Sequence, residues 1–151
     1  MASSLEHIQK FGSTLHTSKS VDSRTATALS SFAKSLANTH VLKSIVGLIL
    51  YGSRARGDHN SPPLFTRGGK MVESDVDVAV VMRGNRPSGT DAAQIEMELF
   101  DSTVEALNAS GGLILEPVAV WESDLENPLE TSHPDLYQSI IRDGIEWQET
   151  A

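Results

Sequence analysis

Short runs of apolar residues alternate with amphipathic stretches along most of the chain. Two runs, Ile45 to Tyr51 and Val76 to Met82, are nearly continuous and bounded by turn residues or acids. Runs of this length and continuity favour strands that are buried on both faces. A third run, "GLILEPVAVW", predicts another strand and contains one carboxylate, Glu116.

Other stretches have the apolar period of an α-helix. A first helix is predicted in "VDSRTATALSSFAKSLANTH", with Asp22 or Ser23 as its cap. A second is predicted from Ser88 or Thr90 to Gly111, and a third from Pro134 to Gly144. The residues expected on the three buried faces are Leu29, Phe32, Ala33 and Leu36; Ala92, Ile95, Leu99, Thr103 and Leu107; and Leu136, Tyr137, Ile140 and Ile141.

This alternation predicts an α+β (α/β) fold in which helices cover a small mixed β-sheet. A chain of 151 residues fits a single domain with a substantial core. We expect that domain over residues 21–151, after an N-terminal segment, residues 1–20, that we expect to be flexible. The glycine pair in "LFTRGGKMV" favours a hairpin, so we predict a hairpin insertion at 59–73 with Arg67 and Lys70 beside its tip.

Composition and charge narrow the classes of function. The apolar runs are far shorter than the roughly 20 residues that span a bilayer, and the first residues lack a signal-peptide core. We therefore expect a cytoplasmic protein that does not bind membranes. The absence of cysteine excludes disulfides and thiolate metal sites.

The two halves of the chain carry opposite charge. Residues 1–90 contain eleven Lys and Arg against six acids, a net charge of +5, whereas residues 91–151 contain one Arg against fourteen acids, a net charge of −13. The first half suits an anionic ligand. The second suits either a basic partner or simple solvation, and the sequence leaves both open.

Asp75 and Asp77 in "SDVDVAVV" are the sharpest chemical signal. Side chains two residues apart leave a strand on the same face, so the two carboxylates are expected to lie close together. Two neighbouring acids are costly to bury unless a cation neutralises them, and all-oxygen ligands favour Mg²⁺ or Mn²⁺. The pair predicts a metal site, although an exposed end of the sheet would also explain it.

Gly52 and Ser53 follow the first predicted strand directly. A glycine there permits a tight turn, and a helix that starts at Ser53 would present N–H groups to an anion. Arg54 and Arg56 add charged donors that suit phosphate. An ordinary strand-to-helix turn with surface arginines is the alternative interpretation.

Taken together, "YGSRARGD" followed by "SDVDVAVV" resembles the nucleotidyltransferase superfamily with the polymerase beta-like fold, specifically its minimal single-domain members. The resemblance covers about residues 20–120. It implies that Gly52, Ser53, Arg54 and Arg56 bind the nucleotide and that Asp75 and Asp77 hold Mg²⁺ or Mn²⁺. The spacer between the two motifs is longer than is usual in the minimal members.

Family members generally carry a third carboxylate on a neighbouring strand. Glu116 is the acid in such a strand here, and Ile114, Val118 and Val120 share its face. The resemblance therefore implies three catalytic acids, Asp75, Asp77 and Glu116. If Glu116 does not fill this role, metal and nucleotide binding persist while transfer is weak. The histidines show no ligand spacing, and Trp121, Trp147 and Phe100 are expected in the core or at an interface.

By resemblance, the expected activity is transfer of an NMP onto a hydroxyl, with AMP from ATP as the first expectation and another NTP as the alternative substrate. The chain is short, so the acceptor is expected to be a partner protein such as the HEPN toxin of a toxin–antitoxin pair. Two alternatives stay open: an inactive antitoxin module that acts by contact, and a transferase for small molecules such as aminoglycosides. We expect no direct nucleic-acid ligand, and the oligomeric state stays open.

Overall fold

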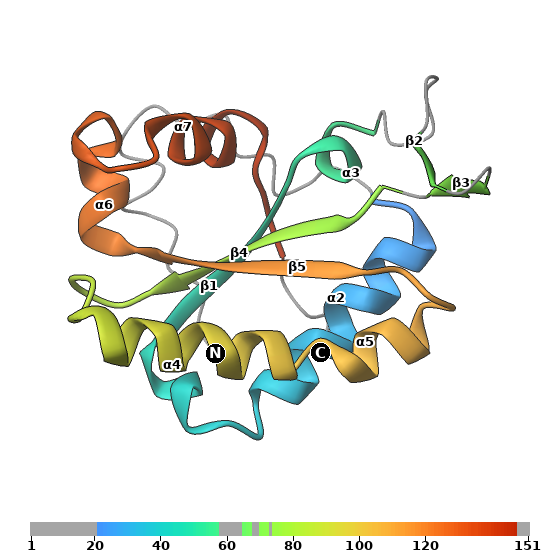
Figure 1. Ribbon diagram of the computed structural model, residues 1–151, viewed down its shortest axis with the longest axis horizontal. Helices are drawn as coiled ribbons and strands as arrows, with labels where there is room; N and C mark the ends of the chain where they lie inside the picture. Colours follow the sequence, from blue (N-terminus) through green and yellow to red (C-terminus); the bar gives the residue numbers. More distant parts are fainter. Residues whose placement is uncertain (1–20, 58–64, 68–69, 73, 148–151) are drawn as a thin grey trace.

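A four-stranded mixed sheet forms the centre of this single α+β domain (Figure 1). The computed structural model describes residues 21–57, 65–67, 70–72 and 74–147, so the predicted segment 1–20 lies outside it. The elements in chain order are α2 (Ser23–Leu36), η1 (His40–Ser44), β1 (Ile45–Tyr51), α3 (Ser53–Arg56), β2 (Phe65–Arg67), β3 (Lys70–Val72), β4 (Val76–Met82), α4 (Gly89–Asp101), α5 (Val104–Ala109), β5 (Leu115–Trp121), α6 (Glu122–Glu126), η2 (Pro128–Glu130), α7 (Pro134–Asp143) and β6 (Ile145–Glu146).

The strand order is β5-β4-β1-β6. β1 runs antiparallel to β4 and β6, while β5 lies parallel to β4. A parallel neighbour requires a crossover, and here the chain crosses through α4 and α5. The end of β1 and the starts of β4 and β5 therefore meet at one end of the sheet.

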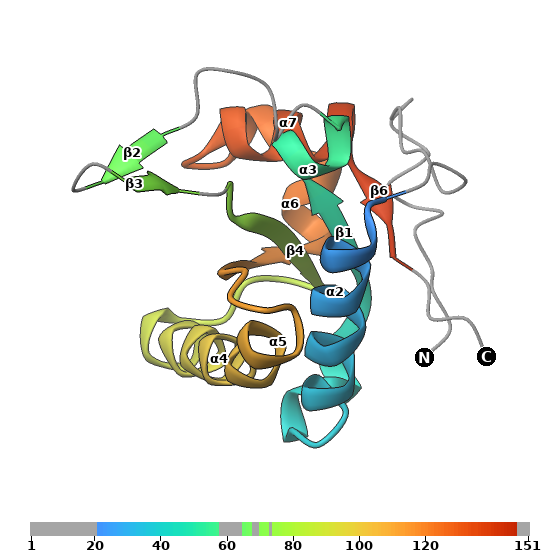
Figure 2. The same cartoon turned by 90° about the vertical axis from the view of Figure 1, so that its right-hand side faces the viewer.

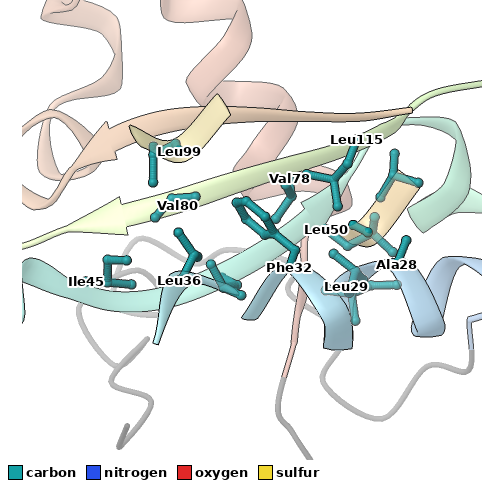
Figure 3. Packing of buried hydrophobic residues seen from close by; sticks show 14 of the residues in the cluster. Ala28, Leu29, Phe32, Leu36, Ile45, Leu50, Val78, Val80, Leu99 and Leu115 are labelled. Atoms are coloured by element: carbon teal, nitrogen blue, oxygen red, sulfur yellow. The ribbon is translucent and has the colours of Figure 1, made fainter. Parts of the chain in front are cut away.

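Helices α2, α4 and α5 cover one face of the sheet, below it in Figure 1. Alternate residues of β4, Val78 and Val80, point into this layer and meet Phe32 of α2 and Leu99 of α4 (Figure 3). The Asp22 side chain caps α2 by accepting a hydrogen bond from the Thr25 N–H (3.1 Å). The predicted first helix and its apolar face are confirmed.

Helices α6 and α7 cover the opposite face, above the sheet in Figure 1. The intervening residues of the strands, such as Ile49 and Val81, pack there against Tyr137 and Ile140 of α7. Pro134 starts α7 and Gly144 follows its last residue, as predicted. In the described residues, no helix combines the length and apolar character that crossing a membrane requires.

The predicted single helix from Ser88 or Thr90 to Gly111 is wrong in one respect, because it is divided into α4 and α5. Between them, the Ser102 hydroxyl donates to the Glu98 carbonyl (2.9 Å) and the Thr103 hydroxyl to the Phe100 carbonyl (2.7 Å). Such bonds compete with regular helix geometry. The expected inward position of Leu107 is also wrong: Leu107 is exposed, and Ala106 is buried.

Two further strands pair outside the predicted core. β2 and β3 form a separate antiparallel hairpin apart from the central sheet (Figure 2), with Arg67 opposite Lys70. The glycine pair between these strands and most of the rest of 59–73 lie outside the described residues. At the other edge, β6 pairs with β1, and the Trp147 N–H donates to the Leu48 carbonyl (2.9 Å).

Candidate functional site

A row of polar side chains crosses the sheet where β1 ends and β4 and β5 begin. Tyr51 is opposite Asp77 in the antiparallel pair, and Asp77 is beside Glu116 in the parallel pair. Partners in register are on the same face of a sheet, and neighbouring strands are about 4.8 Å apart. Asp77 and Glu116, which the sequence analysis predicted as catalytic acids on different strands, are therefore adjacent. The side chains of Tyr51, Asp77 and Glu116 all lie on the face covered by α7. The residues that alternate with them along β1, β4 and β5 point into the opposite layer.

Asp75 joins the row from the residue before β4 begins. Its side chain makes a hydrogen bond with Glu116, and this bond is the largest cause of the raised pKa of the Glu116 carboxyl. Partial burial and the charges of Asp75 and Asp77 raise the same pKa further. Asp75, Asp77 and Glu116 thus gather at one end of the sheet.

The pKa of the Asp77 carboxyl group is also raised. Burial and, to a smaller extent, the charge of Asp75 raise the pKa of Asp77 to about 6, while Arg56 opposes the shift. The same burial, together with Asp77 and Glu116, raises the pKa of the Tyr51 hydroxyl. The row therefore concentrates negative charge where desolvation makes that charge costly, which a bound cation would relieve.

Gly52 lies directly against Asp77. Its backbone, at φ 78° and ψ −159°, is in a region open almost only to glycine. A Cβ at this position would overlap the Asp77 carboxylate oxygen and would be 3.3 Å from its Cγ. Glycine is thus required both for the turn from β1 into α3 and for the close approach of Asp77.

Helix α3 starts at Ser53, as predicted, but it contains only four residues. The N–H groups of Ala55 and Arg56 donate to the Gly52 carbonyl (3.1 Å each), which closes a single turn. A single turn has a weak dipole, so its contribution to anion binding is small. The Ser53 hydroxyl and the Arg56 side chain are the stronger candidates for phosphate contacts.

The guanidinium of Arg54 points into the protein rather than toward the turn. Arg54 is 5 % exposed, and it donates to the Ser74 carbonyl (2.9 Å) and to the Thr25 hydroxyl (2.9 Å). It also lies 3.6 Å from a carboxylate oxygen of Asp22, the cap of α2. The sequence predicted a phosphate contact for Arg54, whereas these bonds make it a positioning residue that fixes the chain just before Asp75.

Replacement of Arg54 by methionine is expected to lower the free energy of unfolding by about 3 kcal/mol, because buried partners lose their hydrogen bonds. Arg56→Met is the matched control. Its side chain is 42 % exposed, so a loss of at most about 1 kcal/mol is expected. Urea unfolding of both variants measures the difference. Equal losses would show that Arg54 has no special structural role.

Arg56 provides positive charge beside the acids. Its guanidinium donates to the Asp143 carboxylate at the end of α7 (3.2 Å). Arg142 and, to a smaller extent, Arg56 hold the pKa of Asp143 below its usual value. Because Arg56 also lowers the pKa of Asp77, it is close enough to influence both carboxylates. It is the arginine of the motif best placed to meet a phosphate.

The remaining predicted residues are more dispersed. The side chains of Arg67 and Lys70 and all of His7, His16 and His59 lie outside what the structure describes. His40 pairs with Glu98 (3.1 Å), and His133 precedes α7. Trp121 is buried in the core. Trp147 is partly buried and packs against that core, whereas Phe100 is exposed. Tyr51 was not predicted as part of the site, although its place at the end of a buried strand was a usable signal.

The chemistry of these acids fits a hard divalent cation. In the described residues, no group of three His, Cys, Asp or Glu side chains is arranged around a common metal position, and Asp75 and Glu116 instead bond to each other. Three carboxyl groups with two raised pKa values are nevertheless the donors that Mg²⁺ or Mn²⁺ would take. Asp75 and Asp77 would hold the ion, with Glu116 beside them.

A hollow of about 490 Å³ lies farther along β5, on the outer edge of the sheet. Val118 contributes to its wall and shares the face of Glu116 two residues earlier, while Tyr137 contributes from α7. The Tyr137 hydroxyl donates to Asp124 (3.1 Å), and burial raises the pKa of Tyr137 to about 12. The hollow is large enough for a small molecule, and the described residues that line it do not include Asp75, Asp77 or Glu116.

Comparison with known proteins adds no family assignment. No protein-family model matches the chain, and no curated protein matches it at a significant level.

Proposed function

We propose that this protein is a divalent-metal-dependent nucleotidyltransferase that transfers an NMP, AMP from ATP in the first instance, to a hydroxyl group of a partner protein. The observation that carries the proposal is the register of Asp77 with Glu116, with Asp75 bonded to Glu116. This register brings together the acids of two motifs that are far apart in sequence. Gly52 lies directly against Asp77, so the turn to which the resemblance assigns nucleotide binding is at the same end of the sheet.

Asp75 and Asp77 would bind the cation, which when present neutralises charge on the nucleotide phosphates and on the attacking oxygen. The Ser53 hydroxyl and the Arg56 guanidinium would hold the phosphates. Arg54 fixes the backbone of Ser74 and so positions Asp75. In this division of roles the protein mainly positions groups and balances charge.

Glu116 is suited to take the proton of the acceptor. The acceptor oxygen forms a bond to the α-phosphorus, the bond from that phosphorus to the bridging oxygen breaks, and pyrophosphate leaves. The hydroxyl proton moves to a carboxylate oxygen of Glu116. A raised pKa makes Glu116 a better proton acceptor than an ordinary surface glutamate. The nucleotidyltransferase family, and a HEPN-type toxin as the protein acceptor, come from the sequence resemblance alone.

Transfer of label from α-labelled ATP to the protein encoded by the adjacent gene tests the activity. With Mg²⁺ present, the wild-type protein should label that partner, and both Asp75→Ala and Asp77→Ala should abolish the label. A tight but unlabelled complex would contradict the enzyme and favour the alternative in which the protein acts by contact alone.

Glu116→Gln should reduce the rate of transfer by about 10²- to 10⁴-fold, the usual contribution of a general base, while ATP still binds. Glu126→Gln, an exposed acid on α6, is the matched control and should transfer at the wild-type rate. Single-turnover transfer and ATP titration measure the two effects. Wild-type transfer by Glu116→Gln would remove Glu116 from the proposed mechanism.

The hollow beside Val118 supports a second candidate, transfer to a small molecule. A cavity of about 490 Å³ lies in the size range of small-molecule sites. Pyrophosphate release that depends on an aminoglycoside, without a partner protein, would favour this candidate. Release that requires the partner protein would favour the first.

A further inference from the structure

Four exposed apolar side chains form a line along α4 and α5. Met97 and Phe100 are each 66 % exposed, Val104 is 57 % exposed and Leu107 is 39 % exposed. They lie at i, i+3, i+7 and i+10, the spacing of one helix face, with two residues on each helix. Single exposed apolar residues are common, but an aligned set rimmed by charge marks an interaction surface. We call these four residues the apolar stripe.

The stripe points away from the core. The opposite side of the same helices supplies Ala92, Leu99 and Ala106 to the buried layer. The helices carrying the stripe lie below the sheet in Figure 1, whereas Asp77 and Glu116 are on the face covered by α7. Helix α5 starts two residues after α4 ends, and both residues between them, Ser102 and Thr103, have right-handed helical backbone angles.

Acidic side chains flank the stripe. Glu96, Asp101 and Glu105 are all exposed on the same helices. The chain has no Lys or Arg between Arg86 and Arg142, a span that contains eleven acids. The basic groups near this layer are on other elements: His40 pairs with Glu98 (3.1 Å), Lys34 lines the groove between α2 and Ala109, and Arg86 lines a hollow together with Glu96. Arg24 of α2 donates to the Ser110 and Gly111 carbonyls that follow α5 (3.1 and 3.2 Å).

From this combination we infer that the apolar stripe is a docking surface for a basic amphipathic helix of another protein. Apolar side chains of the partner at helical spacing would cover Phe100 and Val104, and Lys or Arg on either side would meet the acids. A second copy of this chain fits poorly, because its own acids would face Asp101 and Glu105. The inference does not rest on the proposed transferase activity, since the stripe shares no residue with that site.

The probe is a fluorescent peptide of about 18 residues, long enough to form a helix on contact, with Leu at helical spacing and Lys elsewhere. Fluorescence anisotropy without ATP or metal measures its binding. The wild-type protein should bind it about tenfold more tightly than a peptide of the same composition in which the Leu residues are scattered. Raising the salt concentration should weaken binding.

Phe100→Ser combined with Val104→Ser should weaken binding by about tenfold or more, and Asp101→Lys combined with Glu105→Lys should do the same. Leu129→Ser is the matched control, because Leu129 is 73 % exposed but lies on η2, and it should bind like the wild type. Circular dichroism confirms that each variant is folded. Wild-type binding by the Ser variant, or equal binding of the scattered peptide, would overturn the inference. A wild-type dimer that the Ser variant converts to monomer would assign the stripe to self-association instead.

Discussion

Replacement of Asp77 by asparagine is expected to abolish transfer and yet stabilise the metal-free protein at neutral pH. Asparagine keeps the shape of the side chain but removes a ligand charge, so transfer should fall by at least about 10³-fold. The gain in stability has a separate cause. The folded protein holds the Asp77 carboxylate where burial and Asp75 disfavour its charge.

The pH dependence of this gain follows from the direction of the shift. Because folding raises the pKa of Asp77 from 3.8 to about 6, the protonated side chain favours the folded state. That contribution is complete below pH 3.8 and is lost as the pH rises through 6. The shift sets an upper limit of about 3 kcal/mol, and because solvent reaches the half-buried carboxylate we expect about 1 kcal/mol.

Urea unfolding of the wild type and Asp77→Asn between pH 4 and pH 8, without metal, measures the effect. The two proteins should be about equally stable near pH 4, and the variant should be more stable above pH 6. Asp101→Asn, an exposed acid on α4, is the control and should retain transfer. Excess Mg²⁺ should stabilise the wild type but not Asp77→Asn. If Asp77→Asn is less stable than the wild type at pH 8, the charged Asp77 carboxylate does not destabilise the metal-free folded protein.

Gly52→Ala is expected to cost about 3 kcal/mol of stability and to reduce transfer severely. The φ of 78° with an extended ψ costs a side chain about 1–3 kcal/mol, and the new methyl group would push against the Asp77 carboxylate. Whether the backbone at residue 52 or the Asp77 side chain shifts to relieve the overlap, Asp77 changes its position in the candidate site. Urea unfolding and label transfer measure the two losses.

Gly57→Ala is the matched control for Gly52→Ala. Gly57 also has a positive φ, 84°, but a Cβ there would meet no atom of the described residues within 4 Å. A loss of about 1 kcal/mol from backbone strain alone is expected. Adding Asp77→Ala to Gly52→Ala should return about 1 kcal/mol, because the overlap is removed while the backbone strain stays. If Gly52→Ala and Gly57→Ala lose the same stability, and adding Asp77→Ala to Gly52→Ala regains none, the close approach of Asp77 does not contribute to the cost of a side chain at position 52.

The strands and the polar ends of two of them were predictable from local pattern. Continuous apolar runs predicted β1 and β4, and the spacing of Asp75 and Asp77 predicted a shared face. The strand that contains Glu116 was also predictable, but the sequence did not show which strand would lie beside it in the sheet. Strand order and register depend on contacts between distant segments, and the pairing of Asp77 with Glu116 is fixed by the crossover through α4 and α5.

The misplaced residues have specific physical causes. Arg54 belongs to a charged, turn-like string, and only the folded structure shows Ser74 and Thr25 converging on its guanidinium. The helix break depends on hydroxyl bonds of Ser102 and Thr103 to preceding carbonyls, which a hydrophobic period does not reveal. β6 has only two residues, too few for an alternating pattern.

The central proposal is that Asp75 and Asp77 hold a cation for nucleotide transfer, with Glu116 beside them. Paramagnetic broadening of backbone amide signals by Mn²⁺, with ATP present, tests it without knowledge of the acceptor. We predict selective broadening at Gly52, Asp77 and Glu116, lost in Asp77→Asn, while signals of α4 and α5 stay sharp. Broadening centred on the acids of α6 and η2, or broadening that persists in Asp77→Asn, would contradict the claim.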